Sequence, residues 1–142
     1  MLAEGKAVFD LLPQKPPMVM VDKLLECNDQ KAITGFKIES ENLLVKNDLF
    51  SESGLIENMA QSAALMTGWL ASMEQNGEQK IPIGVIGAVK DLQVFFLPEA
   101  GSEIVTEIKV LYKVANATIV NGKVSSGERI SASCELKIFA AE

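Results

Sequence analysis

The sequence predicts one α+β domain in which an antiparallel sheet wraps around a single long helix. Three observations lead to this prediction. The chain has 142 residues, the usual length of one domain. Residues 55–75 have the length and the apolar character of a buried helix. The segments on both sides of it are strand-like, with apolar and polar residues that alternate with a period of two. We therefore expect a single domain over residues 1–142.

Composition and charge exclude several classes of protein. The chain is 48% hydrophobic and 23% charged, which excludes a disordered protein. Its net charge is -6 and it has no basic run, so we expect no nucleic-acid partner. No apolar run approaches the roughly 20 residues of a membrane helix, and Met1–Lys6 does not resemble a signal peptide. We expect a cytoplasmic protein with no membrane partner.

The residues that usually carry nucleophilic or metal chemistry are scarce. The chain has no histidine, which excludes Ser-His-Asp and Cys-His sites and any histidine base from this chain. Its cysteines, Cys27 and Cys134, are far apart and fit no metal or redox spacing. We expect two free thiols, with Cys134 an inert thiol of the core, and neither a metal nor another cofactor.

The segment before the long helix predicts a short helix and two strands. Ala3–Leu12 has apolar residues at helical spacing, and Pro13 ends that helix. Pro16–Pro17 forces an extended chain, so a strand is expected from Met18 to about Cys27. Ala32–Ile38 is its predicted partner.

The long helix is predicted from Leu55 to Gln75. Ser53 is the expected N-cap, and Asn76–Gly77 is the expected helix stop. From Ala63 to Ala71 nearly every residue is small or apolar, whereas a surface helix would keep a polar stripe. We expect this helix to be buried on most sides.

Four strands are predicted after the helix. The first, Pro82–Leu97, opens with a continuous apolar run that is typical of a strand covered on both faces. Glu103–Lys113 and Arg129–Ala140 alternate in character. Ser126–Gly127 is the preferred turn between the last two strands, and Asn121–Gly122 is the alternative. The expected core faces are Ile104, Ile108, Val110 and Tyr112 in one strand, and Ile130, Ala132, Cys134, Leu136 and Ile138 in the other. One sheet around one apolar helix satisfies this order of elements, and this is the hotdog fold.

Several stretches resemble the 3-hydroxyacyl-(acyl-carrier-protein) dehydratases of type II fatty acid synthesis. Leu11–Asp22 is similar to their N-terminal motif Leu-Leu-Pro-His-Arg-x-Pro-x-Leu-Leu-Val-Asp, and Glu57–Gln61 to the Glu-Ala-Met-Ala-Gln of their central helix. Gly87–Gly101 resembles the strand and turn that follow, and Ser126–Ile130 the last hairpin. The resemblance implies the hotdog fold and a dimer that pairs edge strands across a two-fold axis.

The sequence departs from this family where the family has its catalytic base. The family removes the C2 proton of its substrate with a His in a His-Phe-Pro loop, and none of the residues Asp48–Ile56 before Glu57 is a histidine. Gln14 stands where the N-terminal motif has its His, and Ser51–Glu52 replaces a Pro-Gly pair. The chain most resembles a divergent dehydratase-like subgroup, of the kind associated with aryl-polyene and flexirubin pigment pathways.

Glu57 is the candidate catalytic residue, because the resemblance makes it the acid that protonates the departing 3-hydroxyl. The alternative is that a glutamate near a helix start only favours the helix dipole. Gln61, one turn further on, can hold the Glu57 side chain, and Gln14 can donate into the same pocket. Gln61 is equally well explained as a polar residue at the solvated end of the helix, and a surface role explains Gln14 more simply. Gln61 and Gln14 are therefore the candidate substrate-binding residues. Asp48 is a candidate base, although turn chemistry explains it more simply.

Three functions remain open. The first is a dehydratase that acts on 3-hydroxyacyl thioesters of acyl carrier protein or CoA, in fatty acid or polyene pigment biosynthesis, with Glu57 as acid. The second is a non-catalytic hotdog subunit that completes the site of a His-bearing paralogue. The third is a thioesterase in which a lone carboxylate activates water. The N-terminal motif favours the dehydratase lineage, in a homo-oligomer or in a hetero-oligomer with another hotdog protein.

Overall fold

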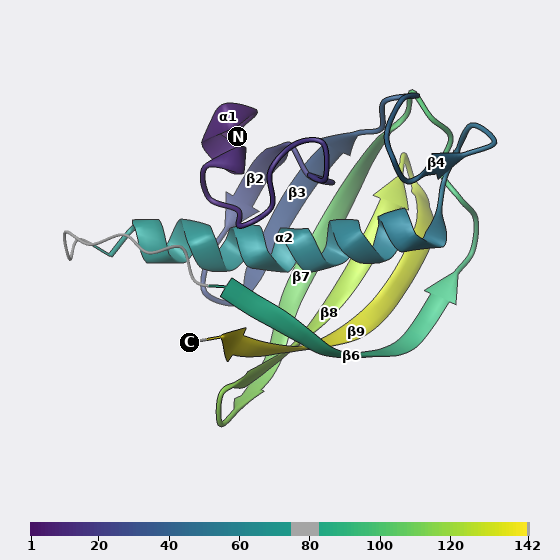
Figure 1. The fold of residues 1–142 in the computed structure, drawn as a ribbon. Helices are drawn as coiled ribbons and strands as arrows, with labels where there is room; N and C mark the ends of the chain where they lie inside the picture. Colours follow the sequence, from purple (N-terminus) through teal and green to yellow (C-terminus); the bar gives the residue numbers. More distant parts are fainter. Residues whose placement is uncertain (75–82, 142) are drawn as a thin grey trace.

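The computed structural model describes residues 1–74 and 83–141, and it contains the predicted sheet and helix (Figure 1). Its elements are β1 (Ala3–Glu4), α1 (Lys6–Phe9), β2 (Lys23–Cys27), β3 (Lys31–Lys37), β4 (Val45–Lys46), β5 (Leu49–Phe50), α2 (Glu52–Ser72), β6 (Ile83–Val94), β7 (Glu103–Val114), β8 (Ala117–Ser126) and β9 (Arg129–Ala141). Seven strands form one antiparallel sheet in the order β1-β2-β3-β7-β8-β9-β6, and β4 pairs with β5. The sheet curves around α2, as the sequence predicts.

The long helix begins earlier than predicted. It runs from Glu52 to Ser72, and its N-cap is Ser51, whose Oγ accepts a hydrogen bond from the Gly54 amide at 3.2 Å. The expected cap, Ser53, therefore lies inside the first turn. The expected stop at Asn76–Gly77 lies outside the described residues. This shift places Glu57 in the second turn, away from the free amides of the helix start.

The core lies between α2 and the concave face of the sheet. Leu55, Met59 and Leu65 of the helix are fully buried. Gly122 of β8 faces Met59, and a Cβ at this glycine would lie 2.9 Å from the Met59 sulfur. The absence of a side chain at this position therefore lets the helix approach the sheet closely.

Two helix side chains decide where β2 begins. Asn58 Nδ2 donates to the Met20 carbonyl at 2.7 Å, and the Met20 amide donates to Gln61 Oε1 at 2.6 Å. Because the backbone of Met20 is bonded to α2, it cannot join a strand ladder at the same groups. The strand expected from Met18 therefore starts only at Lys23.

The N-terminal segment is more extended than the predicted helix over Ala3–Leu12. Ala3 pairs with Leu24 in β2, so the chain starts as a short edge strand. Gly5 then turns with a positive φ of 60°, and only one helical turn, Lys6–Phe9, follows. Pairing with β2 therefore overrides the local helical pattern.

Strand β6 is not covered on both faces, contrary to the prediction from its apolar run. It is the last strand of the sheet, so one side of its backbone has no neighbour among the described residues. Val85 is 53% exposed, and Ile86, Val89 and Leu92 are also exposed. The opposite edge, β1, has only two residues. Within residues 1–74 and 83–141, the sheet thus has one long, apolar edge.

Two residues expected in the core, each beside a β-bulge, are exposed instead. The pairing of β7 with β8 shifts between Val110 and Tyr112, and Tyr112 is 54% exposed instead of buried. The pairing of β8 with β9 shifts at Ser131, and Ile130 is 45% exposed. In β9 the extra residue, Ser131, reverses the alternation and turns Ile130 outward, whereas in β7 all residues from Leu111 to Val114 are exposed. These two core predictions are wrong. The predicted turn at Ser126–Gly127 is confirmed, with a φ of 61° at the glycine, and β8 continues through Asn121–Gly122.

Candidate functional site

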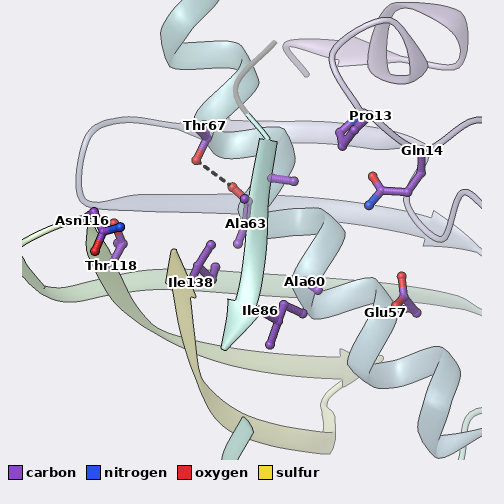
Figure 2. Close-up of a pocket in the computed structure, with 12 residues that line it drawn as sticks. Pro13, Gln14, Glu57, Ala60, Ala63, Thr67, Ile86, Asn116, Thr118 and Ile138 are labelled. Atoms are coloured by element: carbon purple, nitrogen blue, oxygen red, sulfur yellow. Dashed lines mark hydrogen bonds between the residues drawn. The ribbon is translucent and has the colours of Figure 1, made fainter. Parts of the chain in front are cut away.

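A cavity of about 170 Å³ lies beside α2, between the helix and the strands β6, β8 and β9 (Figure 2). Its middle is apolar and built largely from small side chains: Ala60, Ala63 and Ala64 of the helix, with Ile86 and Ile138 from the sheet. Polar side chains lie at the two ends, as Figure 2 shows. Such a cavity can hold an apolar chain that carries polar groups at its two ends.

One end of the cavity carries Glu57 and Gln14, which come from segments far apart in the sequence (Figure 2). Glu57 projects from the second turn of α2 and is half-buried. Gln14 belongs to the loop that follows α1 and is also half-buried. The structure thus brings these two predicted site residues to one cavity.

Gln61 holds the carboxylate of Glu57. Its Nε2 donates to Glu57 Oε2 at 3.0 Å and to the Met18 carbonyl at 3.0 Å, while its Oε1 accepts from the Met20 amide. Gln61 is only 1% exposed, and both of its N–H groups have protein partners. The side chain therefore joins α2, the loop before β2 and Glu57 in one network.

Gln14 has an unusual hydrogen-bonding state. Its Oε1 is buried, and no hydrogen-bond partner lies within reach among the described residues. The Gln14 side chain lines the cavity, and a turn of its amide would bring this acceptor to a molecule bound there. A buried acceptor without a partner is uncommon in folded proteins and costs stability.

The other end of the cavity is formed by Thr67, Asn116 and Thr118. Thr67 and Asn116 are exposed, so this end faces solvent. The Thr67 hydroxyl donates to the Ala63 carbonyl at 3.2 Å. Sequence analysis did not single out these residues, although Thr67 is the one polar residue between Ala63 and Ala71. That interruption marks the open face of the helix, whose other residues from Ala63 to Ala71 are buried or half-buried, as predicted.

The remaining titratable candidates lie elsewhere. Asp48 is exposed in the β4–β5 turn, has a positive φ of 61°, and does not line the cavity. Burial raises the pKa of the Cys134 thiol to about 11, so this buried cysteine is neutral at physiological pH. Within the described part of the chain, no three His, Cys, Asp or Glu residues form a metal-binding group. Glu57 is the single titratable side chain among the described lining residues.

Comparisons with known proteins place the chain in a family. A family model described as ApeP dehydratase, of the ApeP-like group, matches residues 6–142. The chain belongs to the ApeP-like dehydratase family. No curated protein matches the sequence. Among the described residues, no helix is long and apolar enough to cross a membrane.

Solved structures share the hotdog fold of this ApeP-like chain. The dehydratase heterocomplex ApeI:P from Xenorhabdus doucetiae matches at a TM-score of 0.79 and 18% identity, over 95% of this chain and 91% of the other. A hypothetical thioesterase with coenzyme A from Streptococcus pneumoniae matches at 0.66 and 10% identity, over 84% of each chain. The PaaI protein of the Escherichia coli phenylacetic acid degradation operon matches at 0.63 and 10% identity, over 82% and 81%. At identities this low, the structural matches establish the shared fold alone.

Proposed function

We propose that this ApeP-like chain is the Glu57-bearing subunit of a dehydratase for 3-hydroxyacyl thioesters. The observation that carries the proposal is the placement of Glu57, held by Gln61, in a cavity whose described lining has no other titratable group. An elimination needs both an acid and a base. This chain has no histidine, so the base comes from a histidine-bearing hotdog partner.

The reaction uses Glu57 as the acid. The partner's base removes a proton from C2 of the substrate, and the electron pair of that bond forms the C2–C3 double bond. The C3–O bond breaks, and the departing hydroxyl takes the proton of the Glu57 carboxyl and leaves as water. The products are an enoyl thioester and water. The base then loses its proton and Glu57 regains one, which restores the site.

The cavity favours an acyl thioester as the ligand. Its apolar middle suits an acyl chain that runs from C3 at Glu57 toward Thr67 and Asn116, and the thioester with its tether lies on the other side of C3. The tether is the pantetheine arm of acyl carrier protein or of CoA. The pathway is fatty acid or polyene pigment biosynthesis in the cytoplasm.

The partner binds at β6. This strand is the long apolar edge of the sheet, and edges of this kind aggregate unless they are paired. Gly84 and Ile86 of the same strand line the cavity. A partner strand on β6 therefore lies close to Glu57, where its own residues can complete the site. A heterocomplex among the structural matches supports a mixed assembly.

The test compares wild type with Glu57→Gln, each with and without a histidine-bearing hotdog partner. The amide keeps the shape of the carboxyl but cannot transfer its proton, so dehydration of 3-hydroxyacyl thioesters should fall at least ~10²-fold. Glu26→Gln, which makes the same exchange at an exposed position of β2, should keep full activity. Unchanged activity of Glu57→Gln with the partner present would remove this residue from the chemistry.

The same assay distinguishes two alternative functions, a thioesterase and a non-catalytic subunit. A lone carboxylate in a thioester cavity can activate water, and a hotdog thioesterase is among the structural matches. Hydrolysis of simple acyl thioesters by the chain alone, lost in Glu57→Gln, would identify a thioesterase. Binding of thioesters without turnover under any condition would identify a non-catalytic subunit.

A further inference from the structure

Gln14 Oε1 is the one side-chain nitrogen or oxygen atom among the described residues that is buried without a hydrogen-bond partner. The other buried polar side chains are paired: Thr34 Oγ1 with Ser62 Oγ at 2.8 Å, and Thr106 Oγ1 with Asn58 Oδ1 at 2.5 Å. The other buried polar side chains of the described residues thus have hydrogen-bond partners. An acceptor left unpaired at the cavity wall points to a ligand that brings a donor.

The place of this acceptor limits which donor it can take. Gln14 and Glu57 line the same end of the cavity (Figure 2). In the proposed function, Glu57 protonates the oxygen on C3 of the substrate. A 3-hydroxyacyl thioester has one donor at that carbon, the hydrogen of its hydroxyl. The pantetheine amides lie further along the molecule, beyond the thioester.

We infer that Gln14 Oε1 accepts the hydrogen of the substrate's 3-hydroxyl, and that this contact selects 3-hydroxyacyl thioesters over 3-oxoacyl and saturated ones. The inference rests on the proposed function and names the atom that distinguishes the substrate from its 3-oxo and saturated analogues. A 3-oxo group has no donor and would set two acceptors against each other. A saturated chain would leave Gln14 Oε1 unpaired, and sites built for a hydroxyl reject ligands that lack it.

The same contact assists the elimination. When the C3–O bond breaks, the oxygen takes a second proton from Glu57 and becomes water. Its O–H groups become stronger donors during this step, so the hydrogen bond to Gln14 strengthens toward the transition state. Gln14 then contributes to catalysis as well as to binding, because interactions that are stronger in the transition state raise the rate.

The test measures the binding of three pantetheine thioesters by calorimetry: 3-hydroxyhexanoyl, 3-oxohexanoyl and hexanoyl. The protein is the chain together with its hotdog partner, as wild type, Gln14→Met and Gln30→Met. Methionine has a similar length and is apolar, so the substitution removes the acceptor and preserves the shape of the cavity wall. Gln30 is exposed in the β2–β3 turn and provides the matched control.

Gln14→Met should weaken binding of the 3-hydroxyhexanoyl ligand about tenfold, while binding of the hexanoyl ligand stays equal or improves. Retained hexanoyl binding also shows that the variant is folded. Equal losses for both ligands would mean that Gln14 only shapes the cavity, and this would overturn the inference. A tenfold loss confined to the 3-oxohexanoyl ligand would also overturn it, because the amide N–H would then face the cavity. Failure of wild type to bind any of the three thioesters would overturn the proposed function as well.

Discussion

At the scale of single residues, the position of Glu57 depends on Gln61. The two side chains meet because residues four apart lie on one face of a helix. Gln61 is itself fixed by Met18 and Met20, so the carboxylate is attached to the loop before β2 as well as to the helix. The hydrogen bond to Glu57 is the one that the spacing of the two residues predicts, and we expect Gln61 to act by positioning the carboxylate.

Gln61→Leu should lower kcat about 10–100-fold and leave KM nearly unchanged, because the acid loses its orientation and the cavity keeps its apolar wall. The variant should also lose about 1–3 kcal/mol of unfolding free energy, since the buried Met20 amide loses its acceptor. Steady-state kinetics and urea unfolding measure the two effects. A pure change in KM would show that Gln61 binds substrate directly.

At the scale of elements, a glycine lets α2 lie close to the N-terminal segment. A Cβ built on Gly68 would lie 2.5 Å from the carbonyl oxygen of Leu11. This contact sets the position of the loop that carries Gln14, three residues further along. A glycine in the middle of a helix lowers helix propensity, and here the close approach of a second backbone explains it.

Gly68→Ala should destabilise the protein by about 1–3 kcal/mol, although alanine is the better helix former, because the added methyl group forces the two segments apart. Gly35→Ala in β3 is the matched control, since its Cβ would have ordinary contacts of 3.4 Å and longer. Thermal unfolding of the two variants measures the difference. Equal stability of the two would contradict the steric argument.

At the scale of the whole molecule, the described residues leave the long β6 edge of the sheet uncovered. The exposed apolar side chains of β6 and the position of β6 beside the cavity connect assembly with the site. Burial of that edge by a partner would remove apolar surface from water and would satisfy the free backbone groups of the strand.

Val85→Lys should dissociate the assembly, because a charge replaces an apolar side chain on the edge strand. Val105 is the matched control: it is 41% exposed on β7, a strand with neighbours on both sides, so Val105→Lys should leave the assembly intact. Light scattering coupled to size exclusion gives the masses. Dissociation by both substitutions, or by neither, would speak against β6 as the interface.

Local patterns in the sequence determined much of this protein. The long apolar segment gave a helix, the period-two segments after it gave strands, and Glu57 and Gln61 fall on one helix face by their spacing alone. The turn at Ser126–Gly127 followed from its residue types. These features depend on neighbours along the chain, which the sequence displays directly.

The tertiary structure decided the rest. The start of β2 depends on side chains of α2 that lie about forty positions further along the chain. The exposure of β6 depends on the order of strands, that of Tyr112 on the uncovered end of β7, and that of Ile130 on a bulge in β9. The shared cavity of Gln14 and Glu57 depends on how the N-terminal loop packs against the helix. Each of these is set by hydrogen bonds and packing between distant segments, and a local pattern carries no information about which distant backbone will supply them.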